Sequence, residues 1–303
     1  MSFLAKITSG KVKKPAFAVI YGPDGVGKSS FAAEAPGALF LGSEDGTSNL
    51  NVSRLPSMNR LSDVMGAIKE LTVSEHKYKT LAIDSLDWLE RQVIWPAVCE
   101  KDGSENIDKA QGGYGKGYNE ANKVWDEMIA ALMRLREAKG MNIIAIAHSQ
   151  VKTFNDPTQI APYDRYMLKL NDKAAAIWRE AVEAVLFATF EVVTKKENKG
   201  DKKARAYGDG ARVLFTERRP SFDAKNRYGL PFEMPLSWAE FQKGIDLGQP
   251  DSFEAIMSEL VGITTTLADK EMSKRIATAI EKAGGDVASL VKIRNHARVV
   301  ANA

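Results

Sequence analysis

The segment 22–29 has the residue types and the spacing of a phosphate-binding loop. It runs Gly-Pro-Asp-Gly-Val-Gly-Lys-Ser, fits G-x-x-x-x-G-K-[ST] at every fixed position, and follows the apolar run 16–20. Glycines let the backbone turn its N–H groups toward phosphate oxygens, Lys28 supplies a positive charge, and the Ser29 hydroxyl is a ligand suited to Mg²⁺. A glycine-rich turn could match by chance, but the position between a strand and a helix favours a nucleoside triphosphate site. The residues expected to bind nucleotide are Gly22, Pro23, Asp24, Gly25, Val26, Gly27, Lys28, Ser29 and Ser30.

A carboxylate ends the apolar run 80–84. An aspartate at the end of a buried strand, such as Asp84, can hold Mg²⁺ through its water shell. It could also cap the following helix, and the two roles are compatible. We therefore expect Ser29 and Asp84 to bind the metal, with ATP and Mg²⁺ as the cofactors.

Two more polar side chains follow apolar runs. Glu44 comes after the run 38–43, and Gln150 comes after the run 142–147. Ligands of open parallel sheets lie beyond the carboxyl ends of the strands, so both side chains are expected near the γ-phosphate. Glu44 could orient or deprotonate the attacking water, and Gln150 could sense the γ-phosphate and transmit its loss to the next loop. The expected catalytic residues are thus Lys28, Glu44 and Gln150. The alternatives are a plain loop carboxylate for Glu44 and a polar strand end for Gln150. His148 could be a third sensor, but a structural role is expected.

The elements that position these residues alternate along the chain. Apolar runs predict strands at 16–21, 38–43, 80–84, 142–147, 184–190 and 212–216. Apolar stripes at helical spacing lie between them, at 61–72 and 120–139, and later segments predict helices at 252–261, 266–283 and 286–301. This alternation predicts an α/β fold with a doubly wound, mostly parallel sheet. We expect a flexible basic arm at 1–15, a core at 16–248 and a small helical region at 249–303.

The composition is that of an ordinary globular protein. Of the 303 residues 44% are hydrophobic and 27% are charged, and the net charge is +3. No apolar run approaches the roughly 18 residues that a membrane span needs, and the amino terminus lacks a secretory segment. With Cys99 as the single cysteine, no intrachain disulfide can form, and a cytoplasmic location without membrane contact is expected.

Taken together, these features resemble the RecA/RadA recombinase core over roughly residues 15–245. They are the phosphate loop, Glu44, the strand ending in Asp84, the Gly-rich segment 101–119 and the strand ending in Gln150 before the long connection 151–170. The chain looks most similar to phage-encoded RecA-like P-loop ATPases, including the single-strand annealing type. The resemblance implies DNA-stimulated ATP hydrolysis in phage recombination, annealing or replication, within the host bacterial cytoplasm. It also implies a homo-oligomer, as a filament or a ring, and a single-strand-binding or other replication protein as a possible partner; a polymerisation domain of the bacterial RecA kind is not expected.

The resemblance further assigns segments 101–119 and 151–170 to single-stranded DNA. Both combine aromatic with basic side chains, which suits sequence-tolerant stacking on single strands. From composition alone, disordered surface loops or loops that close over a protein are equally compatible. The expected DNA contacts are Tyr114, Lys116, Tyr118, Lys152, Phe154 and Arg165.

Two cations follow the last predicted strand. Lys225 and Arg227 are candidates for a trans-acting finger that stabilises transition-state charge in a neighbouring subunit, the alternative being surface charge or a contact with the DNA backbone. The charged excursion 195–211 is expected to be a solvated hairpin. Two other functions stay open at this level: a helicase loader or replication accessory that grips a protein, and a nucleotide switch with negligible hydrolysis.

Overall fold

The computed structural model describes residues 14–42, 48–191, 193–195, 205–207, 210–248, 253–267 and 269–301. They belong to two compact units. One is Lys14–Gly248, and the other contains the segment that begins at Gln249. Glu44 lies outside the described residues.

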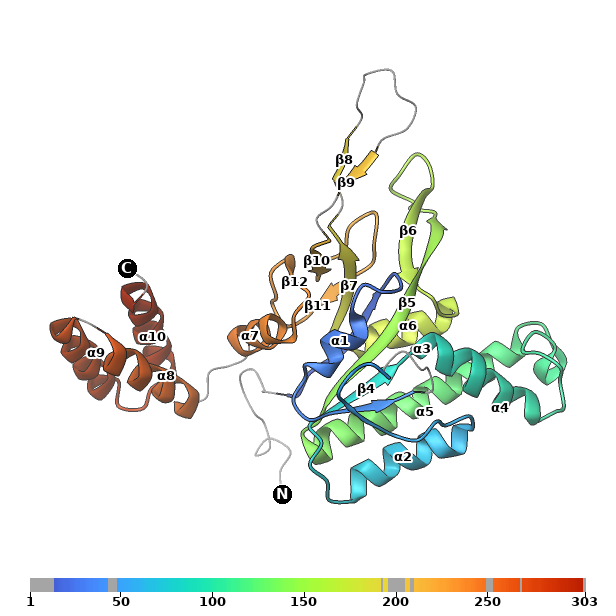
Figure 1. The fold of residues 1–303 in the computed structure, drawn as a ribbon, viewed down its shortest axis with the longest axis horizontal. Coiled ribbons are helices and arrows are strands. Elements are labelled where there is room, and N and C mark those ends of the chain that lie inside the picture. Colours follow the sequence, from blue (N-terminus) through green and yellow to red (C-terminus); the bar gives the residue numbers. More distant parts are fainter. Residues whose placement is uncertain are drawn as a thin grey trace, which may run out of the picture. The chain divides into compact units, whose positions relative to one another are not determined.

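One mixed sheet forms the centre of the first unit (Figure 1). Its order is β12, β10, β7, β1, β5, β4, β2, β3, with β11 beside β7 and β6 beside β5. Strands β1 to β5 and β7 pair in parallel with one another, whereas β6, β10, β11 and β12 are antiparallel to their neighbours. The strands are β1 Phe17–Gly22, β2 Ala38–Leu41, β3 Ser53–Arg54, β4 Thr80–Asp84, β5 Asn142–Phe154, β6 Tyr163–Leu168, β7 Ala184–Phe190, β10 Arg212–Phe215, β11 Lys225–Asn226 and β12 Glu233–Pro235.

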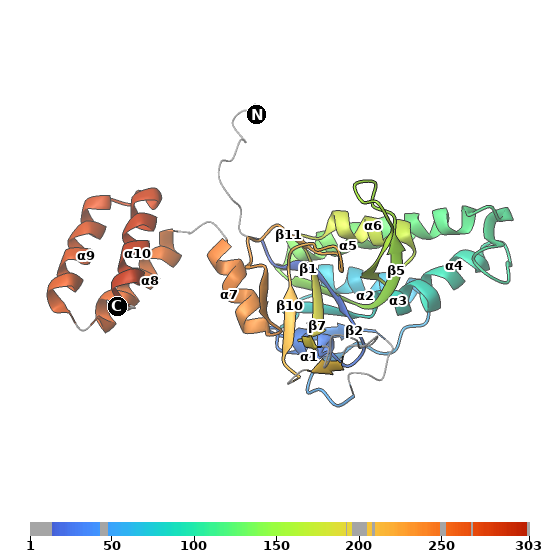
Figure 2. The ribbon, with the colours of Figure 1, turned by 90° about the horizontal axis from the view of Figure 1, so that it is seen from above.

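Helices cover both faces of the sheet, which confirms the predicted doubly wound α/β fold (Figures 1 and 2). All six residues of β1 are buried, and their side chains alternate between the faces. Phe17, Val19 and Tyr21 pack on the side of α2, α5 and α6, and Ile20 packs on the side of α1 and α7. The helices of this unit are α1 Lys28–Ala33, α2 Leu61–Val73, α3 Leu86–Trp88, the π-helix η3 Leu89–Ile94, α4 Trp95–Glu100, the 3₁₀ helix η4 Ala110–Gly112, α5 Lys116–Lys139, α6 Asp172–Ala181 and α7 Trp238–Gly248.

The helical segment after Asp84 passes through a proline without ending. Pro96 has no N–H and its ring crowds the preceding turn, so the sequence predicts that a helix ends or kinks there. The structure instead has the π-helix η3 directly before α4, and Pro96 is the second residue of α4, in its first turn. In the wider π-helical turn the hydrogen bonds skip one more residue than in an α-helix, so the N–H that Pro96 lacks is not needed there.

A β-hairpin replaces the long loop that was predicted for 151–170. β5 continues past the sheet to Phe154, and β6 returns antiparallel to it. The sequence pattern for a strand is weak here, because the rest of the protein covers this hairpin only in part and its side chains need not be apolar. The charged excursion predicted as a hairpin does contain an antiparallel pair, β8 Val193–Lys195 with β9 Arg205–Tyr207.

The second unit contains three helices within its described residues. They enclose a small core of Ile256, Leu260, Ile276, Leu290 and Ala297. In the described parts of both units, no helix has the length and apolarity that crossing a membrane would require. The three helices are α8 Phe253–Thr266, α9 Lys270–Ala283 and α10 Val287–Ala301.

Candidate nucleotide site

The phosphate loop joins β1 to α1 at the carboxyl edge of the sheet, where the sequence predicted it. Gly27 has a φ of 104°, a left-handed backbone that glycine adopts without strain. Lys28 is only 6% exposed, and its Nζ donates hydrogen bonds to the carbonyl oxygens of Gly22 at 3.0 Å and Pro23 at 2.8 Å. The loop therefore folds back over its own lysine and fixes the ammonium group inside the turn.

Ser29 and Asp84 meet across the base of the loop. The Ser29 hydroxyl donates a hydrogen bond of 2.6 Å to Oδ2 of Asp84, whose residue is 8% exposed. Burial raises the pKa of Asp84, against the lowering effects of the Ser29 hydrogen bond and of the nearby positive groups. A cation would relieve the cost of holding this carboxylate charged, and one hydroxyl with one carboxylate is a donor set that suits Mg²⁺. The residues present thus fit the metal that the phosphate loop implies.

Asp87, which the sequence analysis did not single out, forms a pair with His148 beside the phosphate loop. Both oxygens of Asp87 accept from His148, one from the backbone N–H at 3.0 Å and one from Nδ1 at 2.9 Å. The other ring nitrogen, Nε2, lies 3.3 Å from Oδ1 of Asp24 in the loop. The register explains this placement, because His148 pairs with Gly22 across β5 and β1.

The pair is electrostatically coupled. The hydrogen bond to Asp87 raises the pKa of His148 above its usual value, and burial opposes this effect. Burial raises the pKa of Asp87, but the hydrogen bonds from His148 outweigh it and keep that pKa below its usual range. The ring is therefore held firmly, with one nitrogen directed at the loop. In the sequence, the only hints were a histidine at a strand end and an aspartate three residues after Asp84.

Gln150 lies two residues beyond His148, at the base of the hairpin. Its Nε2 donates to the carbonyl oxygens of Leu168 at 2.8 Å and Leu170 at 3.4 Å. Its amide thus ties β5 to the end of β6, and contact with a γ-phosphate stays a prediction. The predicted role of Glu44 likewise stays a prediction, since this residue lies outside the described part of the chain.

The predicted DNA segment 101–119 is folded into turns and the start of α5. Tyr114 is fully exposed, and Lys116 is also exposed. Tyr118, by contrast, packs edge-on against Trp95 at a centroid distance of 5.6 Å and donates a hydrogen bond of 2.8 Å to Asp108. Its ring is committed to this packing, so Tyr114 and Lys116 are the better placed of the three for a ligand.

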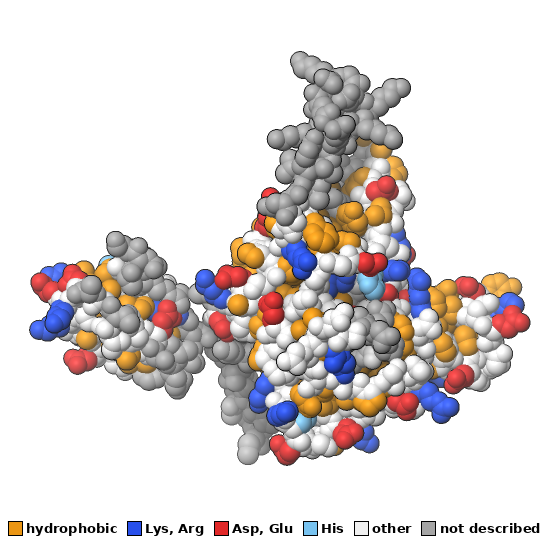
Figure 3. Space-filling view, viewed as in Figure 1, with side chains coloured by type: hydrophobic (Ala, Val, Ile, Leu, Met, Phe, Trp, Pro, Cys, Tyr) orange, Lys and Arg blue, Asp and Glu red, His pale blue; other side chains and the backbone are white. Residues whose placement is uncertain are grey.

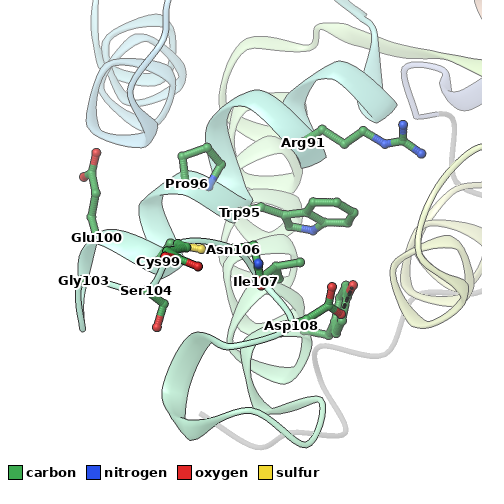
Figure 4. Close-up of a pocket in the computed structure, with 12 residues that line it drawn as sticks. Arg91, Trp95, Pro96, Cys99, Glu100, Gly103, Ser104, Asn106, Ile107 and Asp108 are labelled. Carbon is green, nitrogen blue, oxygen red and sulfur yellow. Dashed lines mark hydrogen bonds between the residues drawn. The ribbon is translucent and has the colours of Figure 1, made fainter.

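A cavity of about 620 Å³ opens where these turns meet α4 (Figure 4). Its walls include Trp95 and Ile107, and Figure 4 shows Asp108 beyond Ile107 and Arg91 farther along the helical segment. The carboxylates of Glu100, Glu105 and Asp108 also line it. This concentration of negative charge disfavours a nucleic-acid backbone inside the cavity.

The hairpin residues predicted to contact DNA have different surroundings. Lys152 pairs with Asp172 at 2.5 Å. The guanidinium of Arg165 lies 4.1 Å from the ring centre of Phe154, donates to the carbonyl of Pro220 at 2.9 Å, and is 4% exposed as a residue. Arg165 thus holds the hairpin against the segment around Pro220, and its contact with DNA stays a prediction.

The two candidate trans-acting cations lie at the opposite edge of the sheet from the phosphate loop, beside the start of β7. Lys225 Nζ donates to three carbonyl oxygens at the end of α6, those of Arg179 at 2.6 Å, Glu180 at 3.1 Å and Val182 at 2.6 Å. Burial, with the charge of Arg227 nearby, lowers the pKa of Lys225. Lys225 thus caps the end of α6 within its own chain, and its role as a trans-acting finger stays a prediction.

Arg227 is more exposed than Lys225. Its guanidinium lies 3.5 Å from a carboxylate oxygen of Glu183, and its side chain is 56% exposed. A weak, solvent-screened ion pair of this kind leaves the guanidinium able to take another anion. The role of Arg227 toward a neighbouring subunit stays a prediction.

The parallel sheet, the phosphate loop that follows β1 and the Ser29–Asp84 contact together define a P-loop nucleoside triphosphatase. The strand that carries His148 lies between the phosphate-loop strand and the strand ending in Asp84. Comparison with protein families agrees: residues 14–228 match the AAA domain family AAA_24. Since the match covers more than half of the chain, the chain belongs to this family and contains an AAA-type P-loop ATPase domain. A search among curated proteins gave no match.

Proposed function

We propose that the chain is a Mg²⁺-dependent ATPase that binds single-stranded DNA and couples hydrolysis to movement of the β5–β6 hairpin. The resemblance to RecA-like ATPases supports a role in phage DNA recombination, annealing or replication, carried out by a homo-oligomer. A single-strand-binding or other replication protein would be a natural partner in that setting.

The observation that carries this proposal is the direct connection between the nucleotide site and the hairpin. The backbone N–H of Lys169 donates to the carbonyl of His148 at 2.9 Å, so the hairpin ladder starts at the residue whose ring faces the phosphate loop. Gln150 adds its bonds to Leu168 and Leu170 just above. A shift of His148 on γ-phosphate loss would therefore move the base of the arm.

A second connection reaches the hairpin base from the helix that follows Asp84. Oε2 of Glu90 accepts the backbone N–H of Asn171 at 2.9 Å, and Glu90 is only 2% exposed. Burial raises the pKa of Glu90. Because Asp87 and Glu90 lie on the same short helical segment, the histidine and the end of the hairpin are fixed to one rigid element.

The outer face of the hairpin offers surface for bases. Val151 and Tyr166 form an exposed cross-strand pair, 56% and 41% exposed, and Ile160 is fully exposed in the turn. The ring of Tyr166 stacks on Phe187 with centroids 5.2 Å apart, and its exposed part, beside apolar side chains, offers a surface on which unpaired bases can stack. Basic and acidic side chains are interspersed on the face seen in Figure 3, which favours stacking over a purely electrostatic mode of binding.

The test is the ATPase rate with and without a single-stranded oligonucleotide at two salt concentrations. We expect several-fold stimulation that weakens at high salt, and no activity in Lys28→Ala. Oligonucleotide anisotropy should show roughly ten-fold weaker binding for Tyr166→Ala, since stacking contributes about 1–3 kcal/mol per base. Val73→Ala, which truncates an exposed apolar residue on α2, is the matched control.

The other outcomes separate the competing functions. Steady turnover that DNA does not change would refute DNA coupling and indicate a protein partner. Binding of Mg-ATP without turnover would indicate a nucleotide switch.

A further inference from the structure

An arginine that belongs to neither the phosphate loop nor a predicted site lies at the same edge of the sheet. Arg212 is the first residue of β10 and pairs with Phe190, the last residue of β7. β7 is the parallel neighbour of β1, whose carboxyl end carries the phosphate loop. The antiparallel course of β10 thus returns Arg212 to the nucleotide edge.

The guanidinium of Arg212 packs directly on the phosphate loop. A Cβ atom placed on Gly27 would lie 2.9 Å from Nη1 of Arg212, 3.7 Å from its Cζ and 3.5 Å from Cδ2 of Leu236. The missing side chain of Gly27 therefore makes room for the arginine, in addition to permitting the positive φ of the loop. Any larger residue at position 27 would displace the guanidinium.

Charge explains why this contact points to a ligand. Arg212 is exposed, no hydrogen bond or ion pair joins its side chain to another described residue, and its guanidinium lies 6.0 Å from the ring centre of Phe190. The residue after Gly27 is Lys28, so two permanent positive charges flank one turn of backbone. A phosphate group bound at this turn would be attracted by both charges, because opposite charges attract most strongly at short distance.

We propose that Arg212 is a second cationic ligand for the phosphate chain of the nucleotide, acting in the same subunit as the loop. The planar guanidinium offers paired N–H donors that match phosphate oxygens, which complements the single-point charge of Lys28. This inference rests on the proposed nucleotide-binding function. It assigns to the subunit a cation of its own, distinct from Arg227 at the far edge of the sheet.

The experiment measures Kd for Mg-ATP and Mg-ADP by calorimetry in four variants. Arg212→Ala should raise both values roughly ten-fold, the size expected for a lost charge-assisted contact, and Arg212→Lys should recover part of the loss. The matched control is Arg134→Ala, which removes an exposed arginine from α5, on the other face of the sheet. Circular dichroism and the thermal shift produced by ATP verify that each variant folds.

A Kd for Arg212→Ala within two-fold of the wild type would overturn the proposal. Lys28→Ala separates this failure from failure of the proposed function. If Lys28→Ala abolishes binding while Arg212→Ala does not change it, only the role of Arg212 is lost. If neither substitution changes the affinity, the phosphate loop itself does not bind the nucleotide.

Discussion

Replacing Asp87 by asparagine isolates the electrostatic part of the Asp–His pair. The substitution keeps the shape of the side chain but removes its charge. One oxygen can still accept from the backbone N–H of His148 or from its ring, whereas the wild-type carboxylate accepts from both at 3.0 and 2.9 Å. The variant therefore loses at least one charge-assisted hydrogen bond at a site where Asp87 is 6% exposed.

The loss of stability can be estimated from the number of charge-assisted hydrogen bonds that the variant lacks. A hydrogen bond to a charged group contributes about 1.5–3 kcal/mol, so Asp87→Asn should lower the free energy of unfolding by about 2 kcal/mol. For a unit of this size, that loss corresponds to a fall in Tm of about 4–8 °C.

The loss should also depend on pH. Because the pKa of His148 is raised in the folded protein, its charged form stabilises the fold fully below the ordinary histidine pKa of about 6.5. That contribution is lost as the pH rises through the raised pKa. The lowered pKa of Asp87 adds stability that is lost only in acid, below the ordinary aspartate range. The difference between wild type and variant should thus be largest near about pH 5–6.5 and shrink above it.

The assay is urea unfolding at several pH values, together with an NMR titration of the histidine rings. The chain has three histidines, so His148→Gln suffices to assign the relevant signal. Asp126→Asn, which neutralises an exposed carboxylate on α5, is the control and should shift neither quantity. A His148 pKa that is the same in wild type and Asp87→Asn, or a stability difference that does not change with pH, would refute the reasoning.

Three further substitutions test the metal site, the hairpin base and Lys225. Ser29→Ala removes the hydroxyl that contacts Asp84 and should raise the Mg²⁺ concentration needed for half-maximal ATPase activity roughly ten-fold, with rescue by Ser29→Thr. Gln150→Ala should leave the ATP Kd within two-fold and abolish stimulation by single-stranded DNA; undiminished stimulation would count against the hairpin as the coupling element. Lys225→Ala should lower the free energy of unfolding by about 1–3 kcal/mol, because three carbonyl oxygens lose their donor. If unfolding is unchanged while ATPase activity falls, Lys225 acts on a neighbour instead of on α6.

Local patterns were enough to predict the framework of the core. The phosphate loop is contiguous, and each of its residues has its own role, so the motif alone located Lys28 and Ser29. Buried parallel strands need continuous apolar runs, which is why β4 and β7 were predicted with the bounds that the structure shows. The extension of β5 to Phe154 was missed because an arm that leaves the sheet no longer needs an apolar pattern.

The long, flexible side chains were the ones whose roles the sequence could not decide. Arg165 and Lys225 both have the residue type of a ligand contact, yet each finds carbonyl oxygens of its own chain within reach. Pro220 is 55 positions from Arg165, and Arg179 is 46 positions from Lys225. No spacing rule connects residues so far apart.

The sequence by itself therefore determined that a phosphate loop stands at the edge of a parallel sheet with Ser29 and Asp84 beneath it. Only the tertiary structure decided which other charges reach that loop. His148 is aligned with Gly22 by the register of β5 on β1, and Arg212 is returned to Gly27 by an antiparallel strand. Strand order and register arise from the packing of the whole sheet, so these contacts are fixed only when every strand is in place.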